Sequence, residues 1–196
     1  IVINFKKKID KKEIDYNQII IKIQKLKPDL LLIANPNSPT GTIINKKKML
    51  GLIRTANKNK CKILLDEAYY PYSKTTLINE INNYKNLIVV RSLKAFGLSG
   101  LRVGYLVSNK NFVEKVSSYR PLYEINSIGA FLFLELLKNY TKVKKSISNL
   151  LLARNYFIKE LNKRNIKFLK SFGNFTHIKI EKNRDKILNF ISKKIY

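Results

Sequence analysis

Short apolar runs alternate along the chain with segments whose apolar residues recur at helical spacing. We expect buried strands at the apolar runs, which cover residues 29–34, 62–65, 87–90 and 101–107. We expect helices at the helically spaced segments, which cover residues 46–57, 76–84, 125–138, 142–164 and 185–195. Two further short strands are expected at residues 166–169 and 176–180. This alternation predicts an α/β fold with a mostly parallel sheet flanked by helices.

The pattern changes near residues 138–141. Beyond this point a long amphipathic helix is expected, with Val143, Ile147 and Leu150 on its apolar face. We therefore predict that residues 1–139 are part of a large domain and that residues 140–196 are part of a smaller C-terminal α/β domain. The sequence starts at Ile1 rather than at Met, which indicates a partial chain.

The chain is strongly basic, with a formal net charge of +26. Its lysines are spread along the sequence and form no stripe with interleaved aromatic residues, so we favour a solvated surface over a nucleic-acid site. A basic field would also attract a phosphorylated substrate. No apolar run approaches the roughly 18 residues of a membrane span, and we expect none. The single cysteine, Cys61, cannot form an intramolecular disulfide, which favours a reducing, cytoplasmic setting.

Four polar segments stand in order along the chain and contain the candidate chemistry. They cover residues 35–42, 66–69, 91–94 and 97–105. Asn37, Asp66 and Lys94 each follow shortly after an expected strand. Because ligands of open α/β sheets bind beyond the carboxyl ends of the strands, we expect these three residues at one edge of the sheet.

These residue types suit pyridoxal 5'-phosphate. The cofactor needs a lysine amine for its aldehyde and an acid that keeps its pyridine nitrogen protonated. Lys94 and Asp66 can supply these two groups. Arg102 offers paired donors for a phosphate, and the glycines around it allow tight turns.

The four segments resemble the aminotransferase class I/II family of fold-type I pyridoxal-phosphate enzymes, and most closely its histidinol-phosphate aminotransferase group. The run from Lys94 to Arg102 matches the spacing between lysine and arginine in that group. The resemblance implies that Lys94 carries the cofactor and that Arg102 contacts its phosphate. It further implies that Asp66 pairs with the pyridine nitrogen and that Tyr69 donates to the phenolic oxygen of the ring.

The sequence departs from the family pattern at two places. The family usually has Asn directly before Pro-Thr-Gly, where this chain has Ser38, and Asn37 is the candidate contact to the cofactor ring. The family also usually has a hydroxyl residue directly before the lysine, where this chain has Leu93. Ser92 is then the candidate hydroxyl for the cofactor phosphate.

Each candidate also has a structural interpretation. Lys94 can be one surface lysine among many, and Arg102 can pair with a surface carboxylate. Asp66 can cap a turn, and Tyr69 can belong to the core. His177 is the only histidine; we interpret it as structural and remote from the four segments. No His, Cys and carboxylate cluster has the spacing of a metal site.

The resemblance implies an aminotransferase that moves an amino group from an amino acid or amino-phosphate substrate to a keto acid, as a homodimer. A decarboxylase of amino-acid phosphates from the same family would use the same Lys94 and Asp66. Two other interpretations stay open: a basic domain without enzymatic activity, and an inactive fragment that keeps the motif.

Overall fold

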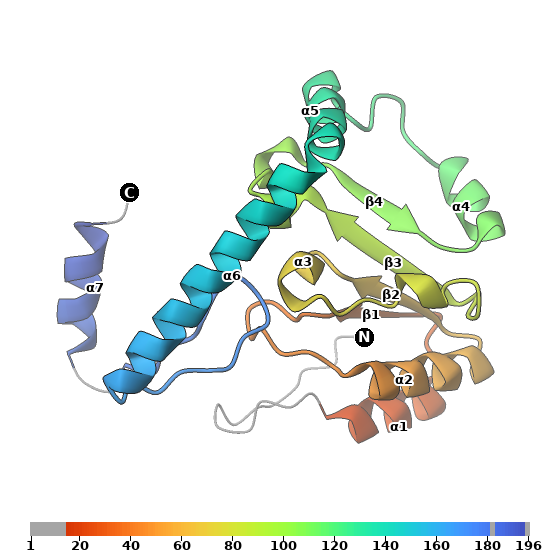
Figure 1. Ribbon diagram of the computed structural model, residues 1–196. Coiled ribbons are helices and arrows are strands. Elements are labelled where there is room, and N and C mark those ends of the chain that lie inside the picture. The colour runs from red at the N-terminus through yellow and green to blue at the C-terminus, as the bar shows by residue number, and fades with distance from the viewer. Residues whose placement is uncertain (1–14, 181–182, 195–196) are drawn as a thin grey trace.

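The computed structural model describes residues 15–180 and 183–194, which form a four-stranded sheet and the helices around it (Figure 1). The strands are β1 (Leu30–Ala34), β2 (Lys62–Asp66), β3 (Leu87–Ser92) and β4 (Gly104–Val107). They lie side by side in chain order. The first three are parallel, and β4 runs antiparallel to β3. The expected α/β fold with a mostly parallel sheet is therefore confirmed.

The two central strands are the most deeply buried part of the sheet. Ile63 and Leu65 on β2 and Leu87 and Val89 on β3 have no exposed surface. At the edge of the described sheet, β1 leaves Leu32 65% exposed, although all five of its residues are apolar. An apolar run thus predicts a strand, but its place in the sheet decides how much of it is buried.

Helices α1 (Tyr16–Leu26) and α2 (Lys46–Lys58) cover one face of the sheet, together at one side of it in Figure 1. Both begin at a capping side chain: Asp15 Oδ1 accepts from Gln18 N at 3.0 Å, and Asn45 Oδ1 accepts from Lys48 N at 2.9 Å. Their inward residues form the main core together with the strands. The buried helix residues in that core are Ile19, Ile23, Met49, Leu52, Ile53 and Ala56.

Several sequence expectations were wrong in detail. The helix expected at residues 76–84 is only a single 3-10 turn, η1 (Ile78–Glu80). The strand expected at 101–107 begins only at Gly104, because residues before it form the 3-10 turn η3 (Ser99–Leu101) and Arg102 then adopts a left-handed φ of 57°. The helices α1, α3 (Tyr70–Ser73) and α4 (Lys110–Ser117) were not predicted.

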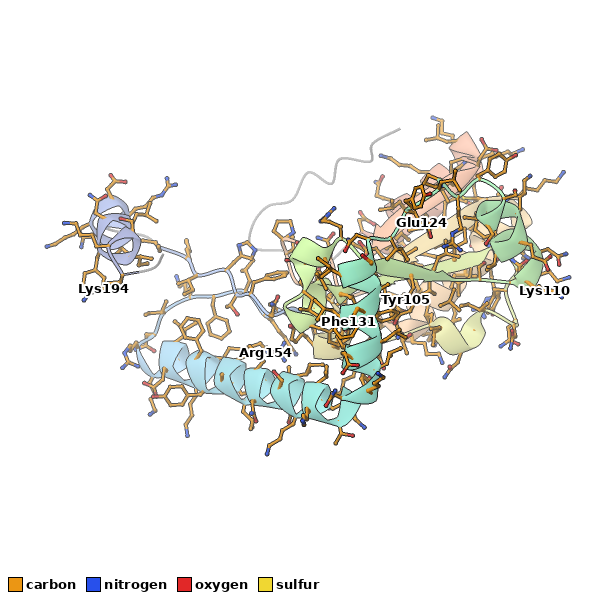
Figure 2. All side chains as sticks on the ribbon, turned by 90° about the horizontal axis from the view of Figure 1, so that it is seen from above. Tyr105, Lys110, Glu124, Phe131, Arg154 and Lys194 are labelled. Carbon is orange, nitrogen blue, oxygen red and sulfur yellow. The ribbon has the colours of Figure 1, made fainter. Side chains whose placement is uncertain are left out.

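Beyond the sheet, α5 (Ser127–Lys138) leads through Asn139 into the long helix α6 (Tyr140–Lys163), which crosses diagonally past the sheet (Figure 1). Ile147 and Leu151 of α6 pack against the buried Tyr69 and Tyr72. The strands expected at 166–169 and 176–180 reduce to one bridge between Phe168 and Ile178. The last helix is α7 (Arg184–Ser192), which lies away from the sheet (Figure 2).

Within residues 15–180 and 183–194, no helix is both long enough and apolar enough to cross a membrane.

Candidate active site

The carboxyl ends of β1, β2 and β3 meet at one edge of the sheet because the three strands are parallel. Asp66 is the last residue of β2, and its backbone oxygen accepts from Asn35 N at 2.8 Å, directly after β1. Ser92 is the last residue of β3 and pairs with Gly104, the first of the antiparallel β4. The antiparallel direction of β4 therefore brings Arg102 to the same edge as Asp66.

Asp66 is half-buried, and its carboxylate is held by the turn that follows it. Oδ1 accepts a hydrogen bond from Ala68 N at 2.8 Å. One oxygen of the Asp66 carboxylate therefore caps this turn, as the structural interpretation of Asp66 expects. A bond from the backbone fixes the carboxylate in place at the sheet edge.

Lys94 and Tyr69 are neighbours across two adjacent strand ends. Tyr69 is buried and directly precedes α3, and Lys94 is exposed in the 3-10 turn η2 (Leu93–Phe96). Lys94 Nζ lies 4.9 Å from the centroid of the Tyr69 ring. The Phe175 ring meets the Tyr69 ring edge-on, with centroids 5.3 Å apart. The interpretation of Tyr69 as a core residue holds for its ring.

Lys94 also borders a pocket of about 520 Å³ between η2 and the helices α5 and α6. The polar side chains that line it with Lys94 are those of Tyr72, Glu135, Ser146 and Asn174. Burial raises the pKa of the Tyr72 phenol, and its hydroxyl donates to the Ala95 carbonyl. Lys94 therefore borders a pocket that mixes apolar and polar groups.

Ser92 and Arg102 frame the turn that carries Lys94. Ser92 Oγ accepts from Lys94 N at 3.4 Å and begins η2 as its capping residue. Gly97 ends that turn with a φ of +78°, which favours glycine. Arg102 is exposed. Its guanidinium is thus available to an anion at the sheet edge.

Asn37 is engaged inside its own turn. Its Nδ2 donates to Thr40 Oγ1 at 2.7 Å, and its backbone oxygen accepts from Gly41 N at 2.7 Å. The deeper anchor of this loop is Asn35, which the sequence interpretation did not select. Asn35 is 2% exposed, and its Oδ1 accepts from Ile44 N at 2.7 Å. The only signal for it in the sequence is a polar residue directly after a buried strand.

A distant segment, residues 171–177, packs onto the same turn. Phe172 N donates to Gly41 O at 2.8 Å, and Ser171 lies against Gly41. The imidazole of His177 contacts the Pro39 carbonyl through Nε2. The expectation that His177 is remote from the four segments was therefore wrong, because the chain folds back after α6. Among the described residues, no cluster of His, Cys and carboxylate side chains could hold a metal ion.

The comparisons with known proteins identify the family of the chain. Residues 1–189 match the family model described as aminotransferase class I and II. The chain belongs to this family. It is 37% identical over 169 residues to histidinol-phosphate aminotransferase of Thermoanaerobacter sp. (strain X514), covering 85% of this chain and 47% of that protein. It is 38% identical over 165 residues to the enzyme of the same name from Caldanaerobacter subterraneus subsp. tengcongensis, covering 83% and 46%.

Solved structures of the family share the fold. The crystal structure of histidinol-phosphate aminotransferase from Clostridium acetobutylicum superposes with a TM-score of 0.81 at 30% identity, covering 92% of this chain and 56% of that chain. L-threonine-O-3-phosphate decarboxylase from Porphyromonas gingivalis superposes with a TM-score of 0.70 at 24% identity, covering 86% and 52%, which shows the fold alone. The chain spans about half the length of the curated relatives it matches.

Sequence interpretation missed one more feature of this aminotransferase-family chain, the ion pair between Glu67 and Arg91. Arg91 donates to Glu67 Oε2 from Nε at 3.0 Å and from Nη2 at 2.8 Å. Thr76 Oγ1 donates to Oε2 at 2.8 Å, and Leu77 N donates to Oε1 at 2.8 Å. Both charges stand in the polar segments of the sequence, at 66–69 and 91–94, but nothing in the sequence pairs them.

Proposed function

We propose that the whole protein carrying this chain is a pyridoxal-phosphate-dependent aminotransferase that acts on an amino acid or amino-phosphate; its curated relatives named above are histidinol-phosphate aminotransferases. The observation that carries the proposal is the meeting of Asp66, Lys94 and Arg102 at one sheet edge, in a chain matched by the family model over residues 1–189. Small-molecule amino donors and keto acids are the substrates that follow from it.

The residues at this edge fit the cofactor. A carboxylate fixed by a backbone bond, an exposed lysine amine and an exposed guanidinium are the three kinds of group that its ring, aldehyde and phosphate require. When bound, pyridoxal phosphate supplies an aldehyde and an electron-withdrawing ring. Tyr69 and Asn37 would lie toward the ring oxygen, and Ser92 toward the phosphate.

The protein residues would bind the cofactor and move protons. Asp66 would keep a proton on the pyridine nitrogen, because a carboxylate stabilises the positive charge there. The Lys94 amine, once free of the cofactor, would move a proton between the substrate carbon and the cofactor carbon. Arg102 would hold the phosphate with paired charge-assisted hydrogen bonds.

Three further proposals concern the whole protein. We propose that residues 1–139 belong to a large cofactor-binding domain and residues 140–196 to a smaller one, which the start of α6 at Tyr140 supports. We propose a homodimer, which the family resemblance supports. We propose a cytoplasmic setting without nucleic-acid binding, which the single buried thiol and the scattered lysines support.

The test is to purify the whole protein with pyridoxal phosphate and follow amino transfer from histidinol phosphate to 2-oxoglutarate. Formation of glutamate supports an aminotransferase. Release of carbon dioxide from an amino-acid phosphate, without amino transfer, would instead favour the decarboxylase. Neither product, with the cofactor bound, would contradict both activities.

A further inference from the structure

We propose that Glu67 is a positioning residue that fixes the spacing between Asp66 and Lys94 by pairing with Arg91. The inference rests on the proposed function, since the spacing matters only if both residues face one cofactor. It concerns residues that lie beside the proposed contacts to the cofactor and are not themselves assigned to it.

The Glu67 carboxylate connects three segments of the proposed site. It follows Asp66 directly, it accepts bonds from the Thr76 hydroxyl and the Leu77 amide, and it pairs with Arg91 near the end of β3. Arg91 directly precedes Ser92 and stands three residues before Lys94. One side chain therefore ties the end of β2 to the chain that carries Lys94.

The Glu67–Arg91 pair lies on the opposite face of the extended chain from the Asp66 side chain. Glu67 N donates to Val90 O at 2.9 Å, which continues the ladder between β2 and β3 by one residue. Neighbouring residues of an extended chain point to opposite faces. Glu67 can therefore fix the sheet edge without occupying the space that Asp66 faces.

Arg91 is held rigidly by groups other than Glu67 as well. Its Nη2 donates to Thr76 Oγ1 at 2.7 Å, and its guanidinium stacks 3.8 Å above the Tyr70 ring. Burial disfavours the charged guanidinium, but the hydrogen bonds that it donates to Glu67 and Tyr105 raise its pKa above the ordinary value. Arg91 therefore stays charged and paired in a buried setting.

Burial gives a physical reason to assign position rather than stability to this pair. The side chains of Glu67 and Arg91 are 1% and 14% exposed. A buried ion pair gains little net stability, because the desolvation of both charges offsets their attraction. Its two bonds, from Nε and Nη2 of Arg91 to the single oxygen Oε2, are charge-assisted and do fix the distance between the strand ends. Four bonds to one carboxylate make this the most constrained side chain described at the sheet edge.

The experiment compares the whole protein with its Glu67→Gln variant, at a temperature where circular dichroism shows both to be folded. The glutamine amide turns at least one of the four accepted bonds into a contact between two donors. We expect pyridoxal phosphate to dissociate about tenfold more readily, as when an outer-shell partner of a bound group is lost. We also expect a shifted pH midpoint of the bound cofactor's absorbance and a lower yield of cofactor trapped on Lys94 by borohydride.

Two further variants complete the experiment. Thr76→Val keeps the shape of the side chain but removes the bond that Thr76 donates to Glu67 and the one that it accepts from Arg91. We expect a smaller change in the same direction, and this variant serves if Glu67→Gln fails to fold. Glu160→Gln breaks an exposed pair with Arg164 at the far end of α6 and should leave cofactor affinity unchanged.

The outcomes separate this inference from the proposed function. A wild-type protein that binds no pyridoxal phosphate overturns both. In the other case the wild-type protein binds pyridoxal phosphate, and Glu67→Gln and Thr76→Val lose only thermal stability. If both variants then keep the wild-type affinity for the cofactor and its absorbance midpoint, the positioning role alone is overturned.

Discussion

The amine of Lys94 lies 4.9 Å from the centre of the Tyr69 ring, although the two residues come from different strand ends 25 positions apart in the sequence. This contact joins the segment at 66–69 to the segment at 91–94. An ammonium over an aromatic face is stabilised by the electrons of the ring. The proposed contacts of Asp66, Tyr69 and Lys94 to one cofactor depend on this junction.

The first prediction concerns the covalent attachment of the cofactor. Borohydride reduction of the whole protein with pyridoxal phosphate should place the label on Lys94, because its exposed amine lies between the ends of β2 and β3. Peptide mapping by mass spectrometry makes the measurement. Lys85, which is exposed at the opposite end of β3, is the matched control. A label on Lys85 at comparable yield would contradict the assignment.

The second prediction concerns Asp66. Asp66→Asn should lower kcat/KM by roughly a hundredfold or more, as expected for the loss of a charge pair worth about 3–5 kcal/mol. Folding should change by less than about 1 kcal/mol, because the amide oxygen can still accept the bond from Ala68 N. Steady-state kinetics and urea denaturation measure the two effects. Near-normal turnover would show that Asp66 does not partner the cofactor ring.

The third prediction concerns the contact between the turn at 37–42 and the segment at 171–177. A Cβ at Gly41 would come within 2.1 Å of Ser171 Oγ, and Gly41 has a φ of +70°. Gly41→Ala should therefore destabilise the protein by about 1–3 kcal/mol. The double variant Gly41→Ala/Ser171→Gly should recover part of this loss, because it removes the clashes with Ser171 Oγ and Cβ but leaves the backbone strain and a 2.9 Å contact to the Cα of position 171. Urea denaturation curves of the single and the double variant measure both changes in the free energy of unfolding, and a Gly41→Ala variant as stable as the wild type would contradict the prediction.

The fourth prediction concerns a buried amide. Asn86 Nδ2 donates to the carbonyls of Ile53 and Cys61, each at 3.1 Å, and so joins α2 to the loops before β2 and β3. Asn86→Ala should cost about 2–3 kcal/mol of unfolding free energy, because both carbonyls lose a donor. Asn83→Ala removes only an exposed bond to Glu80 and should cost less than about 0.5 kcal/mol. Equal losses in thermal denaturation would contradict this account.

The fifth prediction concerns the pH dependence of Cys61. Burial raises the pKa of its thiol, and the charge of Asp29 adds to the shift. The raised pKa means that the folded state binds the proton more tightly than the unfolded state. The resulting stability is fully present below about pH 8.5 and is lost as the pH rises through the folded value. The Cys61→Ala variant should not show this part of the loss of stability at high pH. A thiol reagent at pH 8 should modify Cys61 only as the protein unfolds.

Much of the fold follows from local sequence patterns. The strands at residues 29–34, 62–65 and 87–90 were predicted within two residues, because uninterrupted apolar runs of that length suit buried parallel strands. The helices α2, α5 and α6 follow for a similar reason, since their apolar residues recur at helical spacing. Short elements depend on a few residues and on their neighbours, so the sequence pattern missed α3 and predicted a longer helix where η1 lies.

The spacing of Asp66 to Tyr69 and of Lys94 to Arg102 is a property of the sequence alone, and it sufficed to indicate the family. The tertiary structure decided which distant groups meet. Glu67 pairs with Arg91 across 24 positions, and His177 reaches Pro39 across 138. Periodicity reports only which face of an element is buried. The path of the chain between elements decides the partners of that face, and this path depends on packing of the whole fold.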